Sequence, residues 1–194
     1  MRISLTEKSV LIIVDVQNDF LPGGALAVPN GDAVIEPLNK YIELFRKKKL
    51  PIFATRDWHP ENHVSFKERG GPWPPHCIQN TNGAMISDKL NLPPNVKIID
   101  KAFSPDKDSY SGFQETILDL ELRRLGARRL FIGGLATDYC VKATVLDSLE
   151  LDFETILLLD AIKGVDANPG DSENAILSMI LKGAIAITLE DLIS

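Results

Sequence analysis

The chain has 194 residues, of which 44% are hydrophobic and 25% charged, and its formal net charge at pH 7 is −6. These values are ordinary for a globular protein, and the length predicts a single domain over residues 1–194. The negative charge argues against nucleic acid or an anionic membrane as a partner. Because the sequence lacks an 18-residue apolar run, a secretion signal and a disulfide framework, we expect a cytoplasmic protein with free thiols.

The apolar pattern predicts an alternation of strands and helices. Six short runs are apolar without alternation, which is typical of parallel strands covered on both faces. They are residues 10–14, 51–55, 96–100, 129–135, 155–160 and 184–188. Between them, apolar residues recur at helical spacing in residues 32–48, 113–125, 138–150 and 171–182. This order predicts an α/β fold, with an open sheet covered by helices on both faces.

Residues 57–95 fit this alternation least well. They are rich in proline and glycine, and they contain all three histidines of the chain, His59, His63 and His76. A loop of this length in a compact domain is usually functional. We therefore expect the loop to contribute to a site.

Chemically active residues follow several of the predicted strands, and ligands of open α/β sheets bind beyond the carboxyl ends of strands. Asp15 follows the first strand, and Asp57 and His59 follow the second. Lys101 follows the third strand, and Cys140 lies after the Gly-rich turn that ends the fourth. Each residue alone has an ordinary structural explanation, but their convergence on one edge predicts an active site there.

Cys140 is the predicted nucleophile of this site. Its place at the start of a helix is expected to lower its pKa, and N–H groups of the turn can form an oxyanion hole. Because the histidines look committed elsewhere, Asp15 is the expected base, with Lys101 as its counter-charge. Cys77 lacks the helix context, so packing is its expected role, although a bond between the two cysteines under oxidation remains an alternative.

The opening of the long loop predicts a metal site. Asp57 and His59 stand two residues apart on an extended chain, so their side chains point to the same face. Together with His76 they offer one carboxylate and two imidazoles, a set that Zn²⁺ or Fe²⁺ binds with positions left for water or substrate. His63 is an alternative extra ligand.

Five stretches of the chain resemble the nicotinamidase/pyrazinamidase branch of the isochorismatase-like cysteine hydrolases. They are "DVQNDFLPGGAL" (15–26), "TRDWHPENHVSF" (55–66), "GGPWPPHC" (70–77), "DKAFSPDKDSYSGF" (100–113) and "GLATDYCVKAT" (134–144). They span most of the chain in the family's order. The resemblance implies a three-layer αβα sandwich around a six-stranded parallel sheet.

The resemblance also implies roles for individual residues. It implies a catalytic triad of Asp15, Lys101 and Cys140. It implies a cis peptide bond before Ala136 and an oxyanion hole formed by the N–H groups of Ala136 and Cys140. It implies one divalent metal ion per chain, zinc with iron or manganese as alternatives, held by Asp57, His59 and His76. The substrate-binding residues that it implies are Phe20, Trp73, Tyr110 and Ala136.

The implied reaction is hydrolysis of nicotinamide, and of pyrazinamide, through a thioester of the cysteine. An N-carbamoyl amidase, an isochorismatase and a metal-dependent oxygenase are alternatives, although each leaves part of the residue set unexplained. A catalytically silent binding domain is the alternative outside the enzymes. The apolar segment "FLPGGALAV" (20–28) could lie in an interface, so a homo-oligomer is a further expectation.

Overall fold

The computed structural model describes residues 2–193, and a six-stranded parallel sheet lies at its centre. The strands follow the spatial order β4-β3-β2-β5-β6-β7. All six predicted strands are present. Their bounds are β2 Ser9–Val14, β3 Ile52–Asp57, β4 Lys97–Lys101, β5 Arg129–Leu135, β6 Glu154–Lys163 and β7 Ile185–Ile187.

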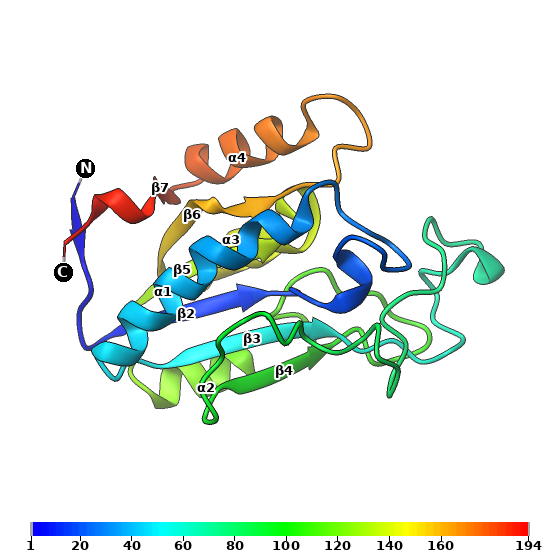
Figure 1. The fold of residues 1–194 in the computed structure, drawn as a ribbon, viewed down its shortest axis with the longest axis horizontal. Coiled ribbons are helices and arrows are strands. Elements are labelled where there is room, and N and C mark those ends of the chain that lie inside the picture. Colours follow the sequence, from blue (N-terminus) through cyan, green and yellow to red (C-terminus); the bar gives the residue numbers. More distant parts are fainter. Residues whose placement is uncertain (1, 194) are drawn as a thin grey trace.

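Helices cover both faces of this sheet (Figure 1). Strand β2 is buried along its whole length, and alternate residues point to opposite faces. Leu11 and Ile13 belong to the core cluster of α1, whereas Val10 and Ile12 belong to that of α2, α3 and α4. These three layers confirm the expected αβα sandwich. The helices are α1 Ile35–Lys47, α2 Leu118–Arg124, α3 Lys142–Glu150 and α4 Asp171–Leu181.

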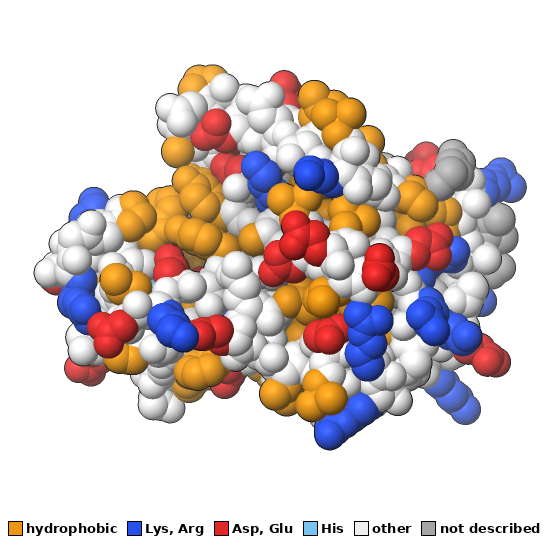
Figure 2. Space-filling model, turned by 180° about the vertical axis from the view of Figure 1, so that it is seen from behind, with side chains coloured by type: hydrophobic (Ala, Val, Ile, Leu, Met, Phe, Trp, Pro, Cys, Tyr) orange, Lys and Arg blue, Asp and Glu red, His pale blue; other side chains and the backbone are white. Residues whose placement is uncertain are grey.

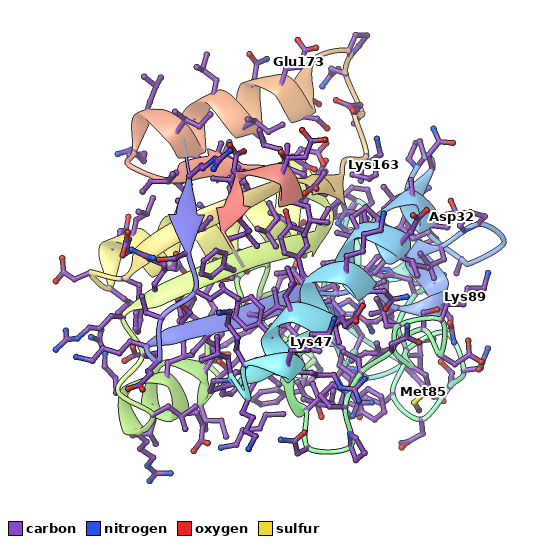
Figure 3. All side chains as sticks on the ribbon, turned by 60° about the vertical axis from the view of Figure 1, so that its left-hand side comes forward. Asp32, Lys47, Met85, Lys89, Lys163 and Glu173 are labelled. Atoms are coloured by element: carbon purple, nitrogen blue, oxygen red, sulfur yellow. The ribbon has the colours of Figure 1, made fainter. Side chains whose placement is uncertain are left out.

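The charges at the two ends of α1 complement the helix dipole. Asp32 lies just before the helix and Lys47 lies in its last turn (Figure 3). Negative charge near the N-terminus and positive charge near the C-terminus each stabilise a helix. The apolar side chains of α1, among them Leu38, Ile42 and Phe45, are fully buried against the sheet.

Several short elements escaped the sequence analysis. Strands β1 (Ile3–Ser4) and β8 (Leu192–Ile193) pair in parallel, and this pairing brings the two ends of the chain together (Figure 1). Two-residue strands are too short to show a periodic pattern. The chain also forms single helical turns of the 3₁₀ type at Asn18–Phe20, Lys67–Arg69 and Leu189–Asp191. A 3₁₀ turn at Gly31–Val34 and a π-helical turn at Thr137–Val141 occupy the predicted starts of two helices, so α1 and α3 begin a few residues later than predicted.

Helix α2 begins at Leu118, later than the predicted start at residue 113. The preceding residues form a turn, in which the Thr116 hydroxyl donates to the carbonyl of Gly112 and accepts from the Leu118 N–H. A threonine hydroxyl that satisfies backbone groups in this way competes with helix formation. The local hydrogen bonds therefore delay the helix despite its apolar pattern.

The long segment between β3 and β4 lies at the carboxyl ends of the strands (Figure 1). It carries one 3₁₀ turn, and the isolated bridge of Ile86 to Gln17 ties it to the turn after β2. Two further bridges, of His59 to Ile78 and of Phe66 to Trp73, lie within the segment itself. Among residues 2–193, every helix is too short or too polar to cross a membrane.

Apolar side chains remain at the surface on the side of α2 and α3, where Figure 2 shows hydrophobic groups between charged ones. The exposed apolar residues include Leu120 of α2 and Leu181 of α4. In contrast, Phe20, Leu21 and Val28 of the segment expected at an interface are buried within their own chain. The homo-oligomer itself stays a prediction.

Candidate active site

Four neighbouring strands bring the predicted catalytic side chains to one edge of the sheet. Asp15 directly follows β2, Asp57 ends β3 and Lys101 ends β4. Cys140 lies in the π-helical turn between β5 and α3. These strands are consecutive in the order β4-β3-β2-β5, so the residues converge although they are far apart in the sequence.

The Lys101 ammonium lies at the centre of this group and is fully buried. Its Nζ is 3.0 Å from Oδ2 of Asp15 and 2.5 Å from Oδ1 of Asp57. It also lies 3.4 Å from Sγ of Cys140 and donates to the carbonyl of Ser109 at 3.0 Å. One cation therefore contacts the expected base, the expected nucleophile and an expected metal ligand.

The surroundings of Asp15 allow its carboxylate to accept a proton. Its Oδ1 accepts a 2.6 Å hydrogen bond from the Thr55 hydroxyl. Its buried Oδ2 lies beside Lys101 but accepts no well-oriented hydrogen bond from residues 2–193. Burial raises the pKa of Asp15 to about 6, although the Lys101 charge acts in the opposite direction. The carboxylate is therefore mostly ionised at neutral pH and can take a proton near that pH.

The expectation of a lowered pKa for Cys140 is wrong. Burial raises its pKa well above the ordinary value, and the Lys101 charge opposes this shift without reversing it. Cys140 lies in the π-helical turn rather than in the first turn of α3, with the cis peptide bond between Leu135 and Ala136 just before it, as the resemblance implied. Cys140 is therefore a thiol at rest and needs a base before it can attack.

Cys77 differs in its surroundings from Cys140, and both thiols are free. Cys77 is fully buried in the apolar cluster of α1, and its N–H donates to the Asp19 carboxylate at 2.7 Å. Burial also raises the pKa of the Cys77 thiol. These contacts agree with the packing role expected for this cysteine.

The metal-ligand set predicted from the sequence comes together beside Lys101. Ligand atoms of Asp57, His59 and His76 all lie within 4.8 Å of one another. The Nδ1 atom of His59 lies 3.1 Å from the His76 carbonyl, and Nδ1 of His76 lies 2.8 Å from the Pro74 carbonyl. Because carbonyls only accept, each Nδ1 carries the proton and each Nε2 is left as a free ligand atom.

The electrostatics of this set also fit a divalent metal ion. Within residues 2–193, Nε2 of His59 is buried without a hydrogen-bond partner, which a metal ion would supply. Burial lowers the pKa of His59 to about 4 and that of His76 below its ordinary value. Both imidazoles are therefore neutral at pH 7, the form that binds metal.

His63 stacks on His59 with ring centroids 4.2 Å apart, but its nitrogens are already engaged. Nδ1 lies 2.7 Å from the Ser65 hydroxyl and Nε2 lies 3.0 Å from the Lys107 carbonyl. His59 and His63 also approach the exposed Asp108 as a second metal-ligating group. Because His63 would have to give up hydrogen bonds to ligate, the group with Asp57 fits a metal better.

A small pocket adjoins Cys140 and the metal-ligand set, and aromatic side chains line much of it. Phe20, Trp73, Tyr110 and Ala136, the residues that the resemblance implied, all contribute to its wall. The Trp73 indole N–H donates to the Tyr110 hydroxyl at 3.1 Å. This hydrogen bond fixes the rings of Trp73 and Tyr110 relative to each other.

The sequence analysis missed four residues of this pocket. Tyr139 packs edge-on against Trp73, with ring centroids 5.1 Å apart, and its position next to Cys140 was a signal that could have found it. Leu26 lies in a stretch that carried the resemblance, whereas nothing in the sequence pointed to Val165. The four missed residues are Leu26, Val28, Tyr139 and Val165.

Comparison with known proteins defines the class of this fold and site. The family model of the isochorismatase domain matches residues 9–191, so the chain belongs to the isochorismatase family. Within the family, it is 39% identical to the nicotinamidase of Escherichia coli (strain K12) over 202 residues. That similarity covers 93% of this chain and 95% of the relative.

Two solved structures are also similar to this chain over almost its whole length. The crystal structure of the pyrazinamidase of Pyrococcus horikoshii in complex with zinc has a TM-score of 0.90 and 52% identity, and it covers 94% of this chain and 99% of that one. The structure of PnC1 from L. infantum in complex with nicotinate also has a TM-score of 0.90, with 35% identity. It covers 100% of this chain and 99% of that one.

Proposed function

We propose that this protein is a nicotinamidase that hydrolyses nicotinamide to nicotinate and ammonia, with pyrazinamide as a second substrate. The observation that carries the proposal is the buried Lys101, which contacts Asp15 and the Cys140 thiol beside an aromatic pocket. Aromatic walls suit a planar ring amide. The similarity to the nicotinamidase of Escherichia coli and to the nicotinate-bound protein of L. infantum supports this substrate.

Acylation begins when Asp15 takes the proton of the Cys140 thiol. The pKa of Asp15, about 6, keeps this carboxylate mostly ionised at neutral pH, and its Oδ2 is available as an acceptor. Lys101, in contact with both groups, offsets negative charge as the thiolate forms. The thiolate attacks the carboxamide carbon, which forms the C–S bond and turns the carbonyl oxygen into an oxyanion.

The oxyanion is assigned to the backbone N–H groups of Ala136 and Cys140. The turn that carries them is held because the Ala136 carbonyl accepts from the N–H groups of Tyr139 and Val141. Collapse of the intermediate breaks the C–N bond, and Asp15 returns its proton to the departing ammonia. Asp15 then takes a proton from water, which cleaves the thioester, releases nicotinate and restores the thiol.

Asp57, His59 and His76 are proposed to hold one divalent metal ion per chain. Zinc is the first choice, with iron or manganese as alternatives, and the zinc complex of the Pyrococcus horikoshii pyrazinamidase supports it. When bound, the ion supplies a Lewis acid that holds the ring nitrogen of the substrate or a water molecule. The Nδ1 contacts of the two histidines orient their rings for this task.

The test is a comparison of turnover across four substrates. Ammonia release is measured with nicotinamide, pyrazinamide and an N-carbamoyl amino acid, and substrate consumption with isochorismate. We expect kcat/KM to be highest for nicotinamide or pyrazinamide. Faster turnover of the carbamoyl compound or of isochorismate would contradict the proposal, and inactivity towards all four would favour a silent binding domain.

A further inference from the structure

Asp57 lies at the end of strand β3, beyond the last residue of the neighbouring strand β2. In a parallel sheet, successive residues point their backbone groups to opposite neighbours. The Trp58 N–H donates to the backbone carbonyl of Lys101 on the β4 side, whereas the Thr55 carbonyl accepts from the backbone N–H of Asp15 on the β2 side. The backbone groups of Asp57 therefore face β2, but β2 has ended at Val14 and the chain turns away.

The side chain of Gln17 takes the place of the missing strand. Its Oε1 accepts the Asp57 N–H at 2.8 Å, and its Nε2 donates to the Asp57 carbonyl at 2.8 Å. The second hydrogen of Nε2 is donated to the Ala84 carbonyl at 2.9 Å. Because a donor faces Oε1 and two acceptors face Nε2, this orientation of the amide is the one that satisfies all partners. Gln17 is fully buried, so water does not replace these bonds.

These hydrogen bonds join three segments around one residue. Gln17 follows Asp15 in the turn after β2. Ala84 precedes Met85, which Figure 3 labels in the long loop. The neighbouring Asn18 N–H donates to the Met85 carbonyl at 3.0 Å, which holds the same two segments together. The residue whose backbone is held between them, Asp57, contacts Lys101 through its carboxylate and belongs to the metal-ligand set.

We infer that Gln17 is a positioning residue, which holds the backbone of Asp57 so that its carboxylate faces both Lys101 and the metal ion. This inference rests on the proposed function, because it assigns Gln17 to the proposed metal site. Hydrogen-bonded residues behind metal ligands are known to tune metal affinity. Loss of the Gln17 amide frees the Asp57 backbone and costs the site its preorganisation.

The experiment measures zinc affinity by competition with a chromophoric chelator. Gln17→Met keeps the length of the side chain and removes all three hydrogen bonds, whereas Gln17→Glu keeps an acceptor and removes both donations. We expect both variants to bind zinc about 10–100-fold more weakly than the wild type. Tyr41→Phe is the matched control, because it deletes a 2.8 Å hydrogen bond to Asp160 away from the site. Its zinc affinity should stay at the wild-type value.

Amide hydrogen exchange gives a second readout that needs no metal. In the wild type the Asp57 amide should be protected as the Trp58 amide is, because each N–H has a buried acceptor. In Gln17→Met, exchange of the Asp57 amide should accelerate, while the Trp58 amide should keep its protection. An unprotected Asp57 amide in the wild-type protein would overturn the inference even if neither variant folded.

The outcomes separate this inference from the proposed function. Zinc binding by the wild type with unchanged affinity in Gln17→Met would overturn the role of Gln17 alone. A wild type that binds no zinc would overturn the proposed metal site, and the positioning role with it. Zinc affinity lowered equally in Tyr41→Phe would reduce Gln17 to a merely structural residue.

Discussion

The charges around Lys101 indicate that the site needs further positive charge. Its ammonium is buried between the carboxylates of Asp15 and Asp57, so the group retains one uncompensated negative charge. Burying such a charge is unfavourable unless it is paired. A divalent ion on Asp57 would offset it, and Lys101 would then remain available to Asp15 and to the thiolate of Cys140.

The nucleophile is tested with the two cysteines as a matched pair. Cys140→Ala should abolish ammonia release while the fold is retained, because no other thiol contacts Lys101 among the described residues. Cys77→Ala should keep much of the activity, since that thiol is buried among apolar residues. Mass spectrometry with an aldehyde analogue should find the adduct on Cys140. Substantial amidase activity in Cys140→Ala would refute the assignment.

The pKa of Asp15 predicts a pH dependence. The base must be ionised, so the rate should fall as the pH drops through about 6, where Asp15 becomes protonated. The Lys101 charge lowers this pKa, so Lys101→Met should raise it and move the acidic limb to higher pH. Single-turnover rates at saturating metal give the profiles. Asp15→Asn should lose about 10²–10⁴-fold in acylation rate, and a near-normal rate would exclude this proton path.

We expect alanine variants of the three histidines to lose metal to different degrees. Purified protein should contain about one divalent ion per chain, as one open site requires. His59→Ala and His76→Ala should lose the ion, whereas His63→Ala should retain more of it because its nitrogens bind Ser65 and Lys107. Elemental analysis measures all four proteins. Equal loss in His63→Ala would show that the second group, with Asp108, takes part in binding.

Strand β5 and the turn that follows it show how elements bring the nucleophile to the base. Gly134 adopts a φ of +125°, and a Cβ there would lie 2.1 Å from the carbonyl oxygen of Val14 in β2. Only glycine permits this approach. The close contact occurs one residue before Asp15 and shortly before the turn that contains Cys140. The Gly-rich end of β5 therefore positions both groups.

Asp138, in the same turn, is expected to support substrate binding. Its two carboxylate oxygens accept the N–H groups of Val165 and Asp166 at 2.9 and 2.8 Å, and Val165 lines the pocket. Asp138→Ala should loosen this wall, raise KM several-fold and lower stability by about 0.5–1.5 kcal/mol through loss of these hydrogen bonds. Steady-state kinetics and urea unfolding measure both effects.

The matched control for this element is Asp166→Asn. It weakens the contact of Asp166 with Ser172 at the start of α4 but leaves Val165 bound to Asp138. Its KM should equal that of the wild type even if stability falls. An unchanged KM in Asp138→Ala would show that the Val165 wall does not depend on this carboxylate.

At the scale of the whole molecule, the proposed metal ion links the sheet to the long loop. Asp57 ends β3 and His76 lies deep in the loop, so an ion between them closes a large part of the chain onto the strand ends. Ligands that bind the folded state stabilise it by mass action. Metal binding should therefore be visible in the unfolding of the entire protein.

Zinc should raise the thermal midpoint of the metal-free protein. At a free concentration of about 100 times Kd the stabilisation is about 2.7 kcal/mol, which corresponds to a rise of about 5–10 °C for a chain of this size. Differential scanning calorimetry before and after chelation measures it, with His76→Ala as the control that should not respond. A midpoint unaffected by complete metal removal would contradict this link.

The sequence by itself determined the strands, the side of the sheet on which the site lies, and the residues Asp15, Asp57, Lys101 and Cys140 that meet there. Apolar runs record burial on both faces, and parallel strands necessarily bring the residues that follow them to one edge. The D-x-H pair likewise carries its own geometry, because alternate residues of an extended chain share a face.

Only the tertiary structure decided the properties that depend on surroundings. The raised pKa of Cys140 follows from burial, which overrides the helix context visible in the sequence. The engagement of His63 depends on Lys107, and the support of Asp57 by Gln17 depends on where β2 ends. Such contacts join residues distant in the chain through loops, where no periodicity specifies which groups meet. Local pattern therefore encodes the sheet and its edge, whereas charge states and hydrogen-bond partners arise only when the loops have packed.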